Sequence, residues 1–193
     1  MTLAERLEAA LRPTPTVPLL PGDLIDEAQG DPIAAAVLIA VTDRADPGVI
    51  LTVRREHMRT HAGQIAFPGG RLDPGEAAAQ AAVREAQEEV GLDPGSVQLV
   101  ATLDNYRTIT GYAVTPVLAV VPPDQPLTPH DFEVSAWFEA PLAHLLDPAQ
   151  QRLETAMFRG EERQYYVIDW DGRRIWGATA AMLVNLSRRL AWP

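Results

Sequence analysis

Three glutamates close together near the middle of the chain, Glu85, Glu88 and Glu89, are the residues best suited to chemistry. Their spacing corresponds to about one helical turn, so on an α-helix their carboxylates would emerge on one face. Like charges at this spacing repel each other, and a bound divalent cation would convert that repulsion into coordination. Because the chain has no cysteine, carboxylate oxygens here favour Mg²⁺ or Mn²⁺ over Zn²⁺. The trio predicts a metal site; the alternative is the solvated acidic face that most Glu-rich runs form.

The residues around these glutamates, 76–90, are predicted to form a helix. They are mainly alanine, glutamate, glutamine and arginine, all good helix formers, and the run stops at Gly91. Apolar residues recur at offsets of three and four in a different sector and are predicted to form the buried stripe: Ala79, Ala82, Val83, Ala86 and Val90. We therefore expect a helix that packs on one side and presents three negative charges on the neighbouring side.

Four further residues stand in register with the glutamates, so that residues 70–91 read G-x5-E-x7-R-E-x-x-E-E-x-G. Seven specified residues at this spacing are not expected by chance in so short a chain. The segment resembles the Nudix box, the catalytic helix of the Nudix hydrolases, at every specified position. The resemblance implies metal-dependent cleavage of a phosphoanhydride, in which the metal neutralises charge on the leaving phosphate and lowers the pKa of a bound water.

The resemblance also implies a role for each charged side chain of the segment. Glu85 and Glu89 are expected to be the principal metal ligands, and Glu88 is expected to help bind metal or activate water, so these three are the predicted catalytic residues. Arg84 would orient a carboxylate by ion pairing rather than touch substrate. Glu76 is the expected partner of Arg84.

Three arginines, Arg54, Arg55 and Arg59, follow a predicted strand upstream of this segment. Guanidinium groups suit bidentate contact with phosphate, although ordinary ion pairs in a surface loop are the alternative. The Phe-Pro-Gly-Gly sequence that ends at Gly69 and Gly70 predicts a turn whose backbone can approach a ligand closely. The candidates for substrate binding are Arg54, Arg59, Gly69 and Gly70.

The whole stretch 50–70, ILTVRREHMRTHAGQIAFPGG, resembles the signature of the coenzyme A pyrophosphatase branch of the Nudix hydrolases, L-L-T-x-R-[S/A]-x3-R-x3-G-x3-F-P-G-G. Two positions depart from it. Ile50 replaces a leucine, which suits a strand equally well. Arg55 stands where the signature has serine or alanine, and its bulk and charge bear on the choice of substrate more than on the reaction. Residues 175–180, IWGATA, resemble a segment common in the same branch.

Glu133, in the loop before a predicted strand, is a further candidate site residue. In the resembled enzymes a loop at such a place sometimes supplies an extra carboxylate ligand or base. A solvated loop acid is the alternative interpretation.

The composition excludes several classes of function. The net charge is −10, which argues against a nucleic-acid partner, and the absence of lysine excludes a Schiff-base or Walker-type lysine. No apolar run is long enough to span a membrane, and the first residues do not resemble a secretory signal. We expect a cytoplasmic protein whose partner is a small-molecule substrate, with no nucleic acid and no membrane; a homodimer is a possible assembly.

The pattern along the chain predicts an α+β protein. A first helix with a capping box from Thr2 to Glu5 and a Pro-rich connector occupy residues 1–32. Strands are predicted at 33–41, 49–54, 97–103, 114–121 and 134–138, a short helix at 140–146, a hairpin at 165–176 with a type I′ turn, and a last helix ending near 190. The resemblance implies the Nudix fold, a mixed β-sheet sandwiched between α-helices, as one domain over residues 1–193 with its core at about 33–190.

Three functions remain open. The first is Mg²⁺- or Mn²⁺-dependent hydrolysis of the diphosphate of coenzyme A or its derivatives, giving 3′,5′-ADP and 4′-phosphopantetheine. The second is the same chemistry on ADP-ribose, a nucleotide sugar or a dNTP. The third is a non-catalytic Nudix-fold nucleotide sensor, which would have no need of the three glutamates.

Overall fold

A computed structural model describes residues 1–12, 14–23, 31–55, 63–130, 132–158 and 160–190. Its main sheet is mixed and has eight strands, with the central order β3-β2-β1-β7-β5; β4 also pairs with β1, β6 with β7, and β8 with β2. The bounds are β1 Ile33–Thr42, β2 Gly48–Arg54, β3 Ile65–Ala66, β4 Gly69–Arg71, β5 Gln98–Thr102, β6 Tyr106–Arg107, β7 Tyr112–Val121 and β8 Val134–Pro141.

The centre of this sheet is the parallel pair β1 and β7, which align over ten residues from Ile33 opposite Tyr112 to Thr42 opposite Val121. The other ladders of the sheet are antiparallel. Both central strands are almost continuously apolar, as expected for strands that are covered on both faces. The parallel pairing makes the sheet mixed, as the resemblance implies.

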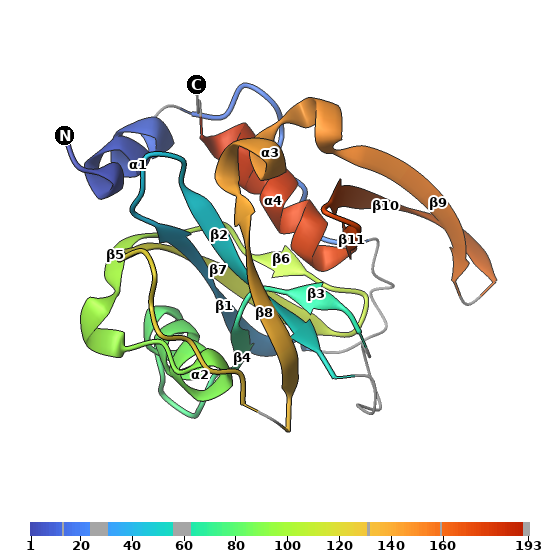
Figure 1. Cartoon of the computed structure of the whole chain (residues 1–193). Coiled ribbons are helices and arrows are strands. Elements are labelled where there is room, and N and C mark those ends of the chain that lie inside the picture. The colour runs from blue at the N-terminus through green and yellow to red at the C-terminus, as the bar shows by residue number, and fades with distance from the viewer. Residues whose placement is uncertain (13, 24–30, 56–62, 131, 159, 191–193) are drawn as a thin grey trace.

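Within the described residues, four α-helices cover the two faces of the sheet (Figure 1). On one face lies α2, Ala78–Val90, and on the other lie α1, Leu3–Leu11, α3, Leu142–Leu146, and α4, Ala178–Arg189. The predicted capping box at the start of α1 is present, because Glu5 N–H donates to Thr2 Oγ1 at 3.2 Å and Thr2 N–H to Glu5 Oε2 at 2.8 Å. The predicted α+β sandwich is therefore confirmed. Short 3₁₀ turns lie at Pro94–Ser96 and Pro148–Gln150.

A second, three-stranded sheet is formed by β9, Arg152–Phe158, β10, Glu161–Trp170, and β11, Arg173–Trp176. The predicted turn between β10 and β11 has positive φ at both central residues, Asp171 at 49° and Gly172 at 70°, as a type I′ turn requires. The strand β9 was not predicted. In Figure 1 the far ends of β9 and β10 extend away from the rest of the molecule.

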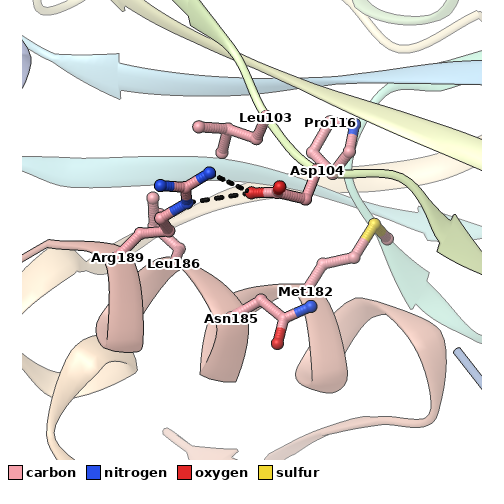
Figure 2. Close-up of a pocket in the computed structure, with 7 residues that line it drawn as sticks. All are labelled: Leu103, Asp104, Pro116, Met182, Asn185, Leu186 and Arg189. Carbon is pink, nitrogen blue, oxygen red and sulfur yellow. Dashed lines mark hydrogen bonds and ion pairs between the residues drawn. The ribbon is translucent and has the colours of Figure 1, made fainter. Parts of the chain in front are cut away.

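The connector after α1 is held along α4. Leu20 exchanges two hydrogen bonds of 2.8 Å with the Asn185 side chain, and Arg188 Nη1 donates to the Pro18 carbonyl at 2.7 Å. Beside these contacts α4 leaves a small hollow against the sheet, whose rim is closed by two hydrogen bonds from Arg189 to Asp104 Oδ2, at 2.9 and 2.7 Å (Figure 2). The hollow lies on the face opposite α2 and is lined by Leu103, Asp104, Pro116, Met182, Asn185, Leu186 and Arg189. It is a packing gap rather than a site, because its charged side chains bind each other.

Within the described part of the chain, no helix has the length and hydropathy needed to cross a membrane.

Candidate active site on helix α2

Helix α2 lies close to the sheet because the residues between them are small. The buried cluster that joins the two consists half of alanine: Ala36, Ala40, Ala81, Ala82, Ala86 and Ala119. Strand β4 adds two glycines, of which Gly70 faces α2 and Gly69 faces β1. A Cβ at Gly70 would collide with the Glu85 carboxylate, and a Cβ at Gly69 would collide with the backbone of Ala36 and Val37. The two glycines were predicted as ligand-binding backbone; in the structure Gly70 makes room for the Glu85 carboxylate and Gly69 makes room for strand β1.

Glu89 is the most buried acidic side chain of the described residues, at 4% exposure. Its Oε2 accepts a hydrogen bond of 3.2 Å from the Gly69 backbone N–H. Burial raises the pKa of Glu89 to about 7; the Gly69 N–H and the charge of Arg54 oppose this rise, whereas Glu85 and Glu133 add to it. A carboxylate held in this way is costly unless a cation compensates its charge.

The other two predicted catalytic residues differ in their surroundings. Glu85 is half-buried against Gly70, and burial raises its pKa although Arg84 opposes the shift. Glu88 is 59% exposed and is held by Arg84 at 3.2 Å. Glu85 and Glu89 therefore line the narrow space between α2 and β4, and Glu88 lies at its solvent side.

The prediction that all three carboxylates share one sector apart from the buried stripe is wrong. Glu89 follows Ala82 and Ala86 at helical offsets of seven and three, which puts it in the same buried sector. Ala81 is also fully buried, whereas the predicted stripe residues Ala79 and Val83 are only partly buried. The helix thus turns two of its glutamates toward the protein rather than toward solvent.

Arg84 binds several of the acidic side chains on and near α2. Its Nε and Nη2 donate to the two carboxylate oxygens of Glu76, both at 2.9 Å, so the predicted pair is present and bidentate. Its Nη1 donates to Glu85 Oε1 at 2.9 Å, and its Nη2 also reaches the Arg71 carbonyl at 3.1 Å. These contacts hold the pKa of Glu76 at about 2, chiefly through the Arg84 hydrogen bond, and raise the pKa of Arg84. One guanidinium therefore fixes α2, the loop before it and the end of β4.

A loop distant in sequence closes the other end of the site. His130 N–H donates to the Glu89 carbonyl at 2.8 Å, and Thr128 N–H donates to the Val90 carbonyl at 2.9 Å. The loop leads to Glu133, whose charge raises the pKa of both Glu85 and Glu89, so its carboxylate is within electrostatic reach of both. Sequence reasoning named Glu133 but missed the anchoring residues 128–130. No local signal identifies these, because backbone groups make the contact.

The predicted substrate-binding arginines are divided between described and undescribed parts of the chain. Arg54 ends β2, and its charge opposes the rise in the pKa of Glu89, so its guanidinium lies within electrostatic reach of that carboxylate. The backbone N–H of Arg55 donates to the Glu133 carbonyl at 3.1 Å, which joins β2 to the loop of Glu133. Arg59 lies outside the described residues.

The donor set fits a hard divalent cation. Glu85 and Glu89 offer carboxylate oxygens from neighbouring turns of one helix, with Glu133 and Glu88 nearby. Within the described ranges no three acidic or histidine side chains converge tightly enough to form a complete metal site by themselves. Mg²⁺ does not need such a cage, because it usually takes one or two carboxylates and completes its shell with water and substrate phosphate. The buried Glu89 carboxylate is the group whose charge such an ion would compensate.

Comparison with known proteins identifies the family of this chain. The NUDIX domain model matches residues 30–159. Over 157 residues, 81% of this chain and 82% of the relative, the sequence is 41% identical to the uncharacterized Nudix hydrolase NudL of Escherichia coli, and it is 40% identical over the same length to NudL of Shigella boydii. A Nudix hydrolase of M. smegmatis, RenU, shares the fold with a TM-score of 0.51 and 24% identity, over 59% of this chain and 73% of that one. This protein therefore belongs to the NUDIX family.

Proposed function

We propose that this protein is a Mg²⁺- or Mn²⁺-dependent pyrophosphatase that hydrolyses coenzyme A or its derivatives to 3′,5′-ADP and 4′-phosphopantetheine. One P–O bond of the diphosphate bridge breaks, and the oxygen of a water molecule forms the new bond to phosphorus. The observation that carries the hydrolase chemistry is the pair Glu85 and Glu89, buried between α2 and the glycines of β4.

In this proposal Glu85 and Glu89 bind the cation and Glu88 assists at the solvent side. When bound, the cation would neutralise charge on the diphosphate and acidify the attacking water. Arg84 and Glu76 are positioning residues, since Arg84 holds Glu85 and Glu88 while its other edge is fixed by Glu76. Glu133 is a further ligand or the general base, supported by its electrostatic influence on both buried glutamates.

Substrate recognition is assigned to the segment before the helix. Arg54, within electrostatic reach of Glu89, and Arg59 would bind phosphate, and Gly69 and Gly70 would let the diphosphate approach the carboxylates. Coenzyme A is chosen because residues 50–70 resemble the signature of the coenzyme A pyrophosphatases. The departure at Arg55 keeps a second candidate open, a Nudix hydrolase of ADP-ribose, a nucleotide sugar or a dNTP. The buried carboxylates argue against a non-catalytic sensor.

We also propose that residues 1–193 act as one domain. Leu3 and Leu7 of α1 belong to the same buried cluster as α3 and α4, and the connector at residues 18–20 is hydrogen-bonded to α4. These contacts support one cooperative unit rather than a separate N-terminal segment.

A substrate panel tests the proposal. Coenzyme A, dephospho-coenzyme A, ADP-ribose, NADH and dNTPs are each incubated with and without Mg²⁺, and the products are identified by mass spectrometry. We expect Mg²⁺-dependent release of 3′,5′-ADP and a higher kcat/KM for coenzyme A than for dephospho-coenzyme A, because an arginine on the 3′-phosphate contributes about 1.5–3 kcal/mol. Faster turnover of ADP-ribose or a dNTP would overturn the substrate and leave the diphosphate chemistry intact.

A further inference from the structure

The second sheet ends in an edge strand that is long and regular. Strand β9 pairs with β10 on one side, and no described strand pairs with its other side. Exposed strand edges are commonly blunted by proline, bulges, very short length or charged side chains. The two charged side chains of β9 are held in ion pairs within their own sheet. In the main sheet β3 has two residues, β5 shifts register against β7, and β8 ends at Pro141 and shifts register against β2. In contrast, β9 is seven residues long, contains no proline or glycine, and keeps a regular register with β10.

The side chains of β9 are also unusually apolar for a strand with no buried residue. Leu153 is 51% exposed and Met157 is 68% exposed. Alternation along the strand puts Leu153, Thr155 and Met157 on one face. The two charged side chains, Arg152 and Glu154, lie on the opposite face, where they form ion pairs with Asp169 and Arg174. The first face therefore presents two large apolar groups on either side of a threonine.

We propose that β9 is a dimerisation edge, which pairs antiparallel with β9 of a second copy of this chain. A two-fold axis perpendicular to the sheet leaves the same face of both copies on the same side. The axis must therefore lie midway between one residue and the identical residue of the second copy. An axis at Thr155 pairs all seven residues. It puts Leu153 opposite the partner's Met157, and the symmetry repeats this apolar contact.

Other registers are less favourable. An axis at Glu154 sets two glutamates opposite each other, which destabilises a strand pair. An axis at Ala156 aligns only five residues and puts Met157 opposite the partner's Thr155. The register with the axis at Thr155 is therefore the most favourable for pairing two copies of β9.

Charge supports a second copy as the partner. The whole chain has a net charge of −10, so two copies repel each other at long range. Strand β9 carries one arginine and one glutamate and is neutral. Two copies can approach here with little electrostatic cost, and the pairing would join two three-stranded sheets into one of six strands.

A cysteine at the two-fold axis tests the geometry directly. Opposed residues in an antiparallel pair have Cα atoms about 4.5–5.5 Å apart, within the range of about 4.4–6.8 Å that a disulfide spans. Because the chain has no cysteine, Thr155→Cys introduces the only thiol. Under mild oxidation we expect a disulfide-linked dimer from Thr155→Cys and none from the control Leu99→Cys, at a position on β5 that is also exposed. Equal or absent cross-linking in the two variants would overturn the proposal.

Charge complementation tests the register. We expect the wild type to dimerise in sedimentation experiments between micromolar and near-millimolar concentration. Leu153→Lys and Met157→Glu should each raise the dimer Kd at least about tenfold, and the double variant should restore it by placing opposite charges across the axis. Leu99→Lys is the control and should dimerise as the wild type does. A monomeric wild type, single variants that dimerise normally, or a double variant that stays monomeric would each overturn the proposal.

Discussion

The two faces of the main sheet are built for different purposes. On the face of α1, α3 and α4 the buried cluster is large and contains mainly leucine, isoleucine, valine and phenylalanine. On the face of α2 the cluster is smaller and half of it is alanine. Large side chains bury more apolar area and contribute more stability, whereas small ones let a helix approach the sheet. The first face mainly stabilises the fold, and the second mainly sets the distance between α2 and β4.

The difference also appears in the polar groups. The α2 face carries Arg84, Glu85 and Glu89 in partly or fully buried positions, with raised pKa values for both glutamates. On the other face the buried polar side chains include Thr179 and Asn185, which bind backbone groups at 3.1 and 2.8 Å. Substitutions on the α2 face should therefore mainly lower activity, and substitutions on the opposite face should mainly lower stability.

The largest expected effect is on the α2 face. Glu85→Gln and Glu89→Gln should each lower kcat for coenzyme A with Mg²⁺ by roughly 10³-fold or more, because several kcal/mol of transition-state stabilisation are lost and about 1.4 kcal/mol corresponds to tenfold. The free energy of unfolding of the metal-free protein should not fall, since each substitution removes a partly or fully buried charge with a raised pKa. Steady-state kinetics and urea denaturation measure the two quantities. Near-normal activity in a folded double variant would remove these residues from catalysis.

The opposite face should give the reverse result. Leu118 of β7 is fully buried in the larger cluster, so Leu118→Ala should lower the free energy of unfolding by about 2–5 kcal/mol. At a temperature where the variant is still folded, kcat should change little. The exposed Leu99→Ala is the control and should change the stability by less than about 0.5 kcal/mol. A large loss of kcat in folded Leu118→Ala would show that the two faces are not independent.

Two buried alanines, one on each face of the sheet, test whether the position of α2 matters for activity. Ala82 of α2 and Ala181 of α4 are both buried, and a leucine at either should cost about 1–3 kcal/mol of stability through overpacking. We expect Ala82→Leu to lower kcat as well, because it pushes α2 away from Gly69 and Gly70. Ala181→Leu should leave kcat nearly unchanged. Equal kcat in the two folded variants would contradict a special role for the α2 distance.

Arg84→Lys should give a smaller effect. Lysine keeps the charge but cannot donate in bidentate fashion to Glu76 while also holding Glu85. We expect the apparent affinity for Mg²⁺ in the kinetic assay to fall about tenfold, equivalent to about 1.4 kcal/mol, with partial recovery at high Mg²⁺. Arg163→Lys, on the projecting hairpin, is the control. An unchanged Mg²⁺ dependence would mean that Arg84 does not position the carboxylates.

Much of the fold followed from local sequence signals. The predicted strands at 33–41, 49–54 and 114–121 lie within β1, β2 and β7, and the type I′ turn at Asp171-Gly172 has the expected φ angles. The bidentate pair of Arg84 with Glu76 was also predictable, because both belong to one short motif.

What escaped prediction depends on distant segments. The burial of Glu89 depends on Gly69, twenty residues earlier, and on a loop forty residues later. The parallel register of β1 with β7 joins residues about eighty positions apart. Every residue of β9 is exposed or half-exposed, so the strand lacks the alternation of buried and exposed residues that would identify it in the sequence. Local patterns identify an element, but tertiary packing decides which of its faces is buried.

Metal binding without substrate tests most directly the central claim that the carboxylates of α2 hold a divalent cation. Mn²⁺ is titrated calorimetrically into the wild type, Glu85→Gln, Glu89→Gln and the control Glu162→Gln, whose glutamate is exposed on β10. We expect saturable binding to the wild type and to the control, with affinity at least about tenfold weaker in the two α2 variants. Wild-type affinity in Glu85→Gln and Glu89→Gln would contradict the claim.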